Sequence, residues 1–169
     1  MKGEEVVLEE MLACRERRAT IQEEMRKQHH ATQISFCMNI PGPIKTNEAI
    51  RKAFDKGLES LKRSIGKETG HILEEWDIHE KTGDEAILEV DLPAETIKTI
   101  TQQIEERTPI GRLYDMDVID QDGKKLSRKE FRKCLICGKQ AQECARSRTH
   151  SVKEMQEAIE KLLASFLQN

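Results

Sequence analysis

The chain has 169 residues, which is enough for one domain with its own hydrophobic core. Charged residues make up 35% of it and aromatic residues 4%, so we expect a highly charged surface around an aliphatic core. The net charge of −3 gives no global electrostatic case for nucleic-acid binding, and no apolar run approaches the ~20 residues of a membrane span.

The cysteine count and the first residues predict the compartment. Five cysteines are an odd number, and three of them cluster with a histidine, which favours a reducing cytoplasm over a disulfide framework. The start, Met1 to Glu5, is acidic and has no apolar block, so we expect no signal peptide.

The first predicted element is a long helix over residues 4–29, where apolar residues recur near helical spacing between charged ones. Arg15 and Arg18 lie three residues apart in it. They would therefore share a face of the helix and could reach one anion together.

A strand over residues 32–40 is predicted from the alternation of apolar and polar side chains. Pro41-Gly42-Pro43 stops it in a rigid turn, and Lys45 is the only long cation there, a binding candidate on a fixed loop. Thr46 can cap the helix that follows, whose apolar face runs to about Gly66.

Two more strands, a helix and a fourth strand complete this part of the chain. The predicted strands cover residues 70–81 and 85–92, and Pro93 opens a helix that ends at Thr108-Pro109. The stretch from Gly111 to Asp120 then alternates apolar residues with acids, which predicts the last strand.

The fourth predicted strand carries two acids. Period two sends Asp115 and Asp117 to one face and the apolar Tyr114, Met116 and Val118 to the other, so the carboxylates project side by side, about 6.5 Å apart at the backbone. Such a pair suits Mg²⁺ (or Mn²⁺), which takes one or two carboxylates plus substrate phosphates. An isolated Asp-x-Asp is more often a solvated sheet face, so the rest of the chain decides between the two interpretations.

The order of elements predicts the fold class. Strand, helix, strand, strand, helix, strand over residues 32–120 is the α+β, ferredoxin-like βαββαβ arrangement, with both helices on one side of an antiparallel sheet. We expect one domain over residues 1–169, in which the helix over 4–29 and the segment over 123–169 wall the opposite, acid-bearing face.

The segment from Gly123 to His150 contains nine lysines or arginines and two acids, an excess of seven positive charges in an acidic chain. Such local asymmetry points to an anionic partner or substrate. Guanidinium groups match phosphate oxygens bidentately, so the arginines of this region could converge on phosphates: Arg112, Arg128, Arg132, Arg146 and Arg148. Gly111 would let the backbone approach a ligand closely. Each arginine singly is more often a solvated surface residue, and this is the interpretation we prefer for Lys124, Lys125 and Lys129.

A cluster of soft ligands lies in the same segment. Cys134 and Cys137 form a Cys-x-x-Cys pair, and Cys144 and His150 complete a Cys₃His set of the kind that holds a structural zinc ion. The alternative is a packed loop with reduced free thiols.

The last predicted element is an amphipathic helix over residues 153–167. Ser151 is the expected N-cap, and Glu154, three residues on, completes a capping box.

The acid pair and the surrounding cations together indicate phosphoryl or nucleotidyl transfer, in which a metal organises an in-line displacement. Two other functions remain open at this point. One is a zinc-knuckle module that holds nucleic acid through residues 123–150, although Phe131 is the only aromatic residue there. The other is an adaptor protein without catalysis, in which the acids merely solvate the sheet.

Motifs along nearly the whole chain resemble the citrate lyase holo-[acyl-carrier-protein] synthase family, also called apo-citrate lyase phosphoribosyl-dephospho-CoA transferases. Arg15, Arg18 and Gln22 of the first helix fit the family pattern. The other matching blocks are Ser35-Phe36-x-x-Asn39-x-Pro41-Gly42-Pro43-Ile44-Lys45, Pro109-x-Gly111-Arg112-Leu113-x-Asp115-x-Asp117-Val118, Ser127-Arg128, Arg132-x-Cys134-Leu135-x-Cys137, Cys144-Ala145-Arg146 and His150.

The resemblance implies a nucleotidyltransferase-type reaction. The donor would be triphosphoribosyl-dephospho-CoA, the acceptor a serine of the acyl-carrier (gamma) subunit of citrate lyase, and the leaving group diphosphate. On this hypothesis Asp115 and Asp117 hold Mg²⁺, and the cations bind the triphosphate: Arg112, Arg128, Arg132, Arg146, Arg148 and Lys45, with Arg15 and Arg18 as weaker candidates. Neither nucleic acid nor a membrane is an expected partner.

Overall fold

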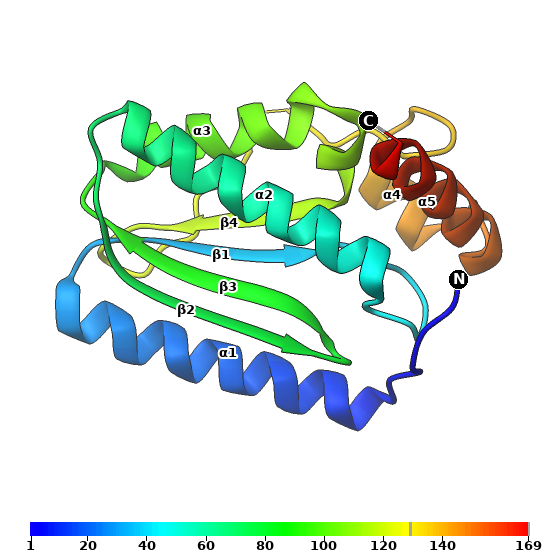
Figure 1. The fold of residues 1–169 in the computed structure, drawn as a ribbon, viewed down its shortest axis with the longest axis horizontal. Helices are drawn as coiled ribbons and strands as arrows, with labels where there is room; N and C mark the ends of the chain where they lie inside the picture. The colour runs from blue at the N-terminus through cyan, green and yellow to red at the C-terminus, as the bar shows by residue number, and fades with distance from the viewer. Residues whose placement is uncertain (129, 169) are drawn as a thin grey trace.

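The structure is a computed structural model that describes residues 1–128 and 130–168. Lys129, one of the lysines expected to be solvated, lies outside the described residues. In chain order the elements are α1 (Leu8–His29), β1 (Thr32–Met38), α2 (Glu48–Lys67), β2 (Ile72–Glu80), β3 (Gly83–Val90), α3 (Ala94–Arg107), the 3₁₀ helix η1 (Pro109–Leu113), β4 (Tyr114–Ile119), α4 (Ala141–Arg146) and α5 (Val152–Leu167) (Figure 1).

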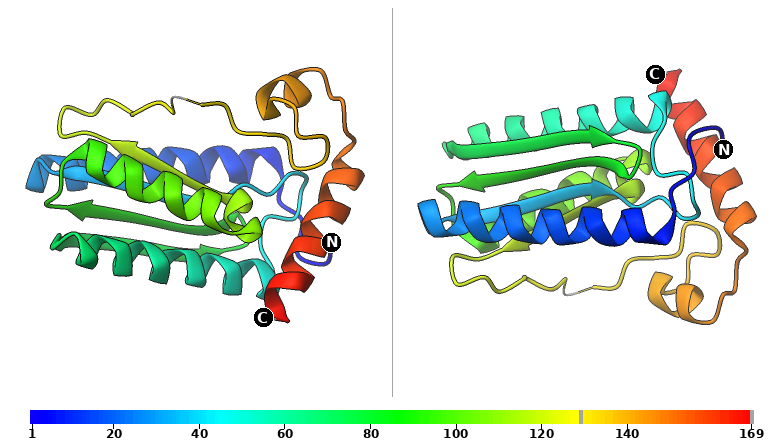
Figure 2. Two further views of the ribbon diagram at one scale, coloured as in Figure 1. Left: turned by 90° about the horizontal axis from the view of Figure 1, so that it is seen from above. Right: turned by 90° about the horizontal axis from the view of Figure 1, so that it is seen from below.

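The four strands form one sheet in the order β2-β3-β1-β4, and each neighbouring pair is antiparallel. α2 and α3 cover one face of the sheet and α1 lies against the other (Figures 1 and 2). The predicted α+β class, with helices and one antiparallel sheet, is confirmed. Among the helices of the described residues, none combines the length and the apolar character that crossing a bilayer requires.

The main core lies between the sheet and the pair α2 and α3. Alternating residues of β1 and β4 point into it, among them Phe36 and Met116, which are opposite each other in the register. The Phe36 ring stacks on Phe54 of α2 at 4.6 Å between centroids, and the Tyr114 hydroxyl donates a 3.0 Å hydrogen bond to the carbonyl of Ala53. Each fully buried large side chain contributes roughly 1.5–3 kcal/mol of burial free energy, so this face holds the sheet and helices together.

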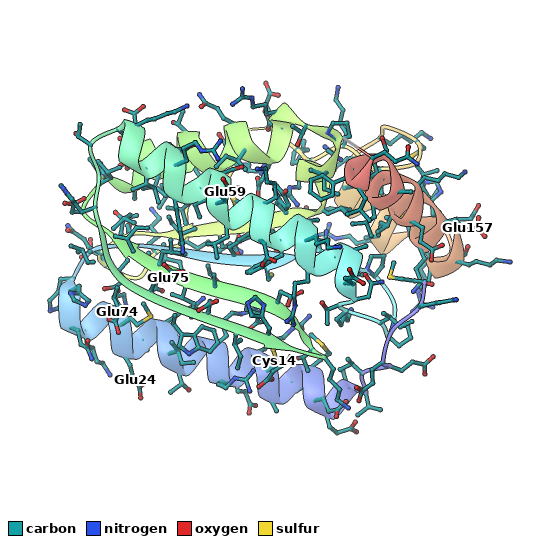
Figure 3. The ribbon with its side chains drawn as sticks, viewed as in Figure 1. Cys14, Glu24, Glu59, Glu74, Glu75 and Glu157 are labelled. Atoms are coloured by element: carbon teal, nitrogen blue, oxygen red, sulfur yellow. The ribbon has the colours of Figure 1, made fainter. Side chains whose placement is uncertain are left out.

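The opposite face of the sheet is more polar, although it includes the fully buried Ile87, and α1 packs on it partly through charged and hydrogen-bonded groups. Cys14 points from α1 toward the sheet (Figure 3), and its thiol donates to Oε1 of Glu85 at 3.2 Å. Arg18 Nη1 forms an ion pair with the same carboxylate at 2.7 Å. The Gln33 side-chain amide reaches back to the carbonyl of Gln22 at 2.9 Å.

Several predicted boundaries shift for local reasons. α1 begins at Leu8 rather than at residue 4, because Glu5 bridges to Ile44 and the Val6 amide donates to Pro43. Asn47, rather than Thr46, caps α2: its side chain accepts from the Ile50 amide.

β4 begins at Tyr114 rather than at Gly111, because residues 109–113 wind into η1. Leu113 consequently packs in the core, 2% exposed, although a strand that began at Gly111 would place it on the same face as the acids. Thr46 has a different partner from the expected one, since its hydroxyl donates to Asp84 at 2.5 Å.

The chain after β4 turns back along the outer edge of that strand (Figure 2). The Leu126 amide donates to the carbonyl of Val118 at 2.8 Å, and the Arg132 guanidinium donates to the carbonyl of Tyr114. α4, which the sequence pattern did not predict, and α5 close this end of the molecule. The predicted capping box of α5 is confirmed, with Ser151 accepting from the Glu154 amide and the Glu154 carboxylate accepting from the Ser151 amide.

Candidate active site

The two acids of β4 project from the polar face of the sheet. Their side chains are 47% exposed for Asp115 and 33% for Asp117, whereas Tyr114, Met116 and Val118 are buried on the other face, as the alternation predicts. In the register with β1, Asp115 lies opposite Cys37 and Asp117 opposite Ser35.

The charges around the two acids are unequal. Asp117 Oδ2 accepts from Lys125 Nζ at 2.5 Å, whereas the ion pair of Asp115 within the described part of the chain is with Arg132, at 4.0 Å between Nη1 and Oδ1. Burial, followed by the neighbouring Asp117, raises the pKa of Asp115 above its usual value, and Arg132, Lys125 and Arg18 offset only part of this shift. A cation bound between the acids would relieve the repulsion.

Cys37 does not supply a nucleophile to this face. Burial, followed by the charge of Asp115, raises the pKa of its thiol to about 12, so the thiol stays protonated at neutral pH.

A cleft of about 490 Å³ runs beside the acids, between β4 and the returning C-terminal segment. Asp115 and Asp117 line it, and so do four cations of the described residues: Lys98 from α3, and Lys125, Arg128 and Arg132 from the segment that follows β4. The predicted wall from the C-terminal segment is therefore present beside the acids.

Lys98 of α3 is a residue that the sequence interpretation did not include. Its ammonium group has no ion pair or hydrogen bond among the described residues, and it lies close enough to Asp117 for their charges to interact. Burial lowers the pKa of this lysine, because it is the charged form that loses solvation. The surrounding α3 sequence reads as an ordinary amphipathic helix, so only the fold shows that this lysine faces the cleft.

Glu105 in the last turn of α3 anchors two of the cleft arginines. Its side chain is 4% exposed and forms ion pairs with Arg128 and with Arg132, the latter at 2.7 Å. Its Oε1 also accepts from the Met116 amide at 2.8 Å, satisfying part of the open edge of β4. This cluster holds Arg128 and Arg132 beside β4 and so keeps the cleft in shape.

Replacing Glu105 with alanine should destabilise the fold by roughly 3 kcal/mol or more, because two poorly solvated guanidiniums lose their carboxylate and a buried amide loses its acceptor. The urea midpoint of unfolding measures this. Glu106→Ala is the matched control: it removes the adjacent acid, which pairs with Arg128 at the surface and is 63% exposed, and should cost under about 1 kcal/mol. Equal midpoints for the two variants would show that the buried cluster contributes no stability.

A second cavity, of about 650 Å³, lies on the far side of Arg132. It shares Asn39, Arg132, Ala141 and Ala145 with the cleft, so the two spaces are adjacent. Arg112, predicted to stand beside the acids, lines this second cavity and not the cleft.

The predicted Cys₃His set comes together beside the second cavity, which Cys134, Cys144 and His150 line. The ligand atoms of Cys134, Cys137, Cys144 and His150 all lie within 4.8 Å of one another, which makes this a possible metal site. Cys137 and Cys144 have 3.5 Å between their sulfur atoms, and Nε2 of His150 is buried without a hydrogen-bond partner. All five cysteines are free.

The pKa values of two thiols in this cluster shift in opposite directions, and burial, followed by the hydrogen bond with Cys137, raises that of Cys144 to about 11. The Lys139 amide, followed by His150, lowers the pKa of Cys137 to about 6, which favours the thiolate form that binds metals. The Cys134 amide donates to the Lys139 carbonyl at 2.5 Å and the Gly138 amide to the Cys134 carbonyl at 3.1 Å, so the Cys-x-x-Cys pair lies in a tight turn. Gly138 has φ of +72°, a left-handed conformation that favours glycine.

Comparison with known proteins identifies the family of this chain. A family model described as apo-citrate lyase phosphoribosyl-dephospho-CoA transferase matches residues 6–166. The chain belongs to this family. Relatives of that name from Shigella boydii serotype 18 and Escherichia coli O157:H7 are each 34% identical over 162 residues, which cover 94% of this chain and 88% of each relative. The family resemblance identified from the sequence motifs is confirmed.

Four of the remaining predicted site residues of this family member lie outside the linings of both cavities: Arg15, Arg18, Lys45 and Arg146. Arg18 is paired with Glu85, and Lys45 donates from Nζ to the carbonyl of Ile40 at 2.9 Å. Arg15 is exposed on α1. Burial of Lys45, followed by the nearby positive charge of Arg15, lowers the pKa of Lys45. Arg146 is exposed on α4, whereas Arg148 lines the second cavity.

Gly111 has a structural reason to be glycine. A Cβ at this position would lie 2.5 Å from the carbonyl oxygen of Ile104 and 2.8 Å from that of Glu105. The close approach predicted for a ligand is thus an approach to the end of α3, which lets η1 turn tightly into β4.

Proposed function

We propose that this protein transfers the phosphoribosyl-dephospho-CoA group of triphosphoribosyl-dephospho-CoA to a serine of the acyl-carrier subunit of apo-citrate lyase. The serine oxygen forms a bond to the α-phosphorus, the bond from that phosphorus to diphosphate breaks, and the serine proton leaves to a base or to water. Family membership supports the reaction. The observation that supports its location is the pair of acids on β4 beside a cleft lined with cations.

Asp115 and Asp117 fit a divalent cation, because they are two carboxylates on the same face of β4. Burial, followed by repulsion from Asp117, raises the pKa of Asp115, and a bound cation would offset that repulsion. On this proposal they hold Mg²⁺ or Mn²⁺, which when bound supplies positive charge against the α-phosphate and the leaving diphosphate. Lys125, now paired with Asp117, is the cation best placed to turn toward a phosphate once the acids have another partner.

The cations of the cleft have separate tasks in this proposal. Lys98 has no direct partner to give up and can bind a phosphate oxygen from the α3 side. Arg132 lies between the two cavities and can contact both ends of the donor. Arg128 is held by Glu105 and Glu106, so we assign it chiefly to shaping the wall.

The fold and domain organisation follow the same proposal. We infer a ferredoxin-like βαββαβ core, supported by the strand order β2-β3-β1-β4 and by the two helices on one face. Residues 1–169 would act as one transferase domain, since α5 contributes Ile159 and Leu163 to the main core.

We also propose that the Cys₃His cluster holds a structural zinc ion. Zinc–sulfur bonds of about 2.3 Å in a tetrahedral site place two sulfur atoms about 3.8 Å apart, close to the 3.5 Å between Cys137 and Cys144. The buried, unpartnered Nε2 of His150 is the other observation that fits. These four residues would tie the segment over 133–150 into one unit.

The acyl-carrier subunit would dock on the basic segment over residues 123–150. The seven excess positive charges there suit an acidic protein surface, and added salt should weaken such docking.

Transfer to the purified carrier subunit tests the proposal directly. Incubation with triphosphoribosyl-dephospho-CoA and Mg²⁺ should raise the mass of the carrier by one prosthetic group and release diphosphate, and a carrier with alanine at the acceptor serine should stay unmodified. An adaptor or a nucleic-acid-binding module would leave the carrier unchanged in both reactions.

A further inference from the structure

The second cavity has a composition unlike that of the acid cleft. Its floor is formed by apolar side chains from η1, the Cys-x-x-Cys turn and α5: Leu113, Leu135, Val152, Met155 and Ile159. At about 650 Å³ it lies within the range of small-molecule and cofactor sites, which are mostly apolar with a few placed polar groups. It is therefore suited to a largely apolar, flat or flexible group rather than to a polyphosphate.

Two arginines that line this apolar space have guanidinium groups without partners among the described residues. The guanidiniums of Arg112 and Arg148 have no hydrogen bond or ion pair among residues 1–128 and 130–168, in contrast to Arg128 and Arg132. Arg148 is further fixed by its backbone, which has φ of +49°, and by the hydrogen bond from the Thr149 amide to the Cys144 carbonyl at 3.0 Å. Two free guanidiniums over an apolar floor match a diphosphate joined to an aromatic ring.

The position of the cavity relative to the cleft adds a constraint. The two share Asn39, Arg132, Ala141 and Ala145, so one molecule can extend from the acids into the apolar space. The donor in the proposed function has this layout, because a reacting triphosphate at one end is joined through ribose to an adenosine diphosphate that carries the pantetheine arm.

We propose that the second cavity binds the dephospho-CoA part of the donor, with the diphosphate against Arg112 and Arg148 and the adenine ring on the apolar floor. This inference rests on the proposed function for the identity of the donor. On this proposal the part of the donor that does not react binds in a space separate from the acids. The second cavity then selects the donor, and the cleft performs the transfer.

Calorimetric titration of the full chain with two simple probes separates the two spaces. Dephospho-CoA reports on the second cavity, and inorganic tripolyphosphate with Mg²⁺ reports on the cleft. Arg148→Gln should weaken dephospho-CoA binding about tenfold or more by loss of a charge-assisted contact, and Met155→Glu should abolish it by placing a carboxylate on the floor. Neither variant should change tripolyphosphate affinity, whereas Lys98→Ala should weaken tripolyphosphate and leave dephospho-CoA unchanged.

The matched control is Lys139→Gln, which removes one positive charge from the same segment at an exposed position outside both linings. It should bind both probes as the natural chain does, and thermal melting confirms that each variant is folded. ADP should compete with dephospho-CoA for the cavity and pantetheine should not; the reverse result would overturn the adenine placement.

The assignment of the cavity is wrong if the natural chain does not bind dephospho-CoA, or if Arg148→Gln and Met155→Glu bind it with unchanged affinity. That outcome leaves the proposed function standing as long as the carrier subunit is modified. Conversely, the chain could bind dephospho-CoA with the expected losses in Arg148→Gln and Met155→Glu and yet never modify the carrier. That result would contradict the proposed function and support the assignment of the cavity.

Discussion

Asp115→Asn and Asp117→Asn should each lower the rate of prosthetic-group transfer by about a thousandfold or more while the chain stays folded. A metal ion at developing phosphate charge contributes several kcal/mol to the transition state, and each 1.4 kcal/mol is a factor of ten in rate. Both side chains project from the polar face of β4 and neither belongs to the core, so the loss should appear in catalysis. Steady-state transfer to the carrier subunit, with the Mg²⁺ concentration varied, measures it.

Asp115→Asn should be at least as stable as the natural chain at pH 7, although its transfer rate falls. The pKa of Asp115 is raised in the folded chain, so the folded state prefers the protonated form, and the ionised carboxylate destabilises the fold. This cost appears as pH rises from the ordinary pKa of 3.8 through the raised value, and it is fully present above that value. Asp115→Asn should therefore melt at or above the natural chain at pH 7, and the difference should vanish below pH 3.8.

Asp55→Asn provides the control for these substitutions, because it makes the same change on the exposed surface of α2, outside both cavities. It should transfer the group at the rate of the natural chain. Normal turnover by either β4 variant would exclude the acids from the metal site, and a lowered melting temperature for Asp115→Asn would contradict the electrostatic reasoning.

The strand that carries these acids shows what a sequence pattern can predict. Alternation over Tyr114 to Ile119 determines which side chains are buried, and the structure buries the same three. The capping box at Ser151 is equally local, since the four residues that form it are consecutive in the chain. Such features depend on neighbours a few residues away, which the sequence displays directly.

The features that the pattern missed depend on distant segments. Glu105 reads as one acid among several on an amphipathic helix, and only the fold brings Arg128 and Arg132 to it from more than twenty residues away. Lys98 reads as a solvated helix residue for the same reason. Arg112 directly precedes the acid strand in sequence, yet η1 turns it toward the second cavity, because the tight winding of residues 109–113 breaks the period-two pattern.

The Cys₃His cluster lies between these two cases. The four ligand types were visible in the sequence, but their loose spacing could not decide whether they meet, and α4 was not predicted. That short helix, Ala141–Arg146, places Cys144 against the Cys-x-x-Cys turn, and the chain after it returns His150 to the same point. Ligand types can be read from sequence, whereas their convergence requires the path of the chain.

Removing the metal from this cluster should lower the melting temperature by about 10 °C. A structural zinc ion supplies folding free energy to a segment that has little core of its own, and a loss of several kcal/mol corresponds to 2–4 °C per kcal/mol in a chain of this size. Of the segment over 133–150, Cys134 and Cys144 are buried while most other residues are exposed, so without the metal the turn and α4 have few contacts to hold them. Differential scanning calorimetry of Cys144→Ser, beside elemental analysis of the purified chain, measures both parts of the claim.

Cys14→Ser is the matched substitution outside the cluster. It also replaces a buried cysteine, and the serine hydroxyl can still donate to Glu85. We expect about one zinc ion per chain in the natural protein and in Cys14→Ser, and none in Cys144→Ser. Two results would show that the cluster is only a set of packed thiols. One is a natural chain that neither contains nor takes up zinc, and the other is a melting temperature of Cys144→Ser equal to that of Cys14→Ser. If the zinc is present, its loss should also weaken dephospho-CoA binding, because Leu135 within the Cys-x-x-Cys turn and Arg148 two residues before His150 both line the second cavity.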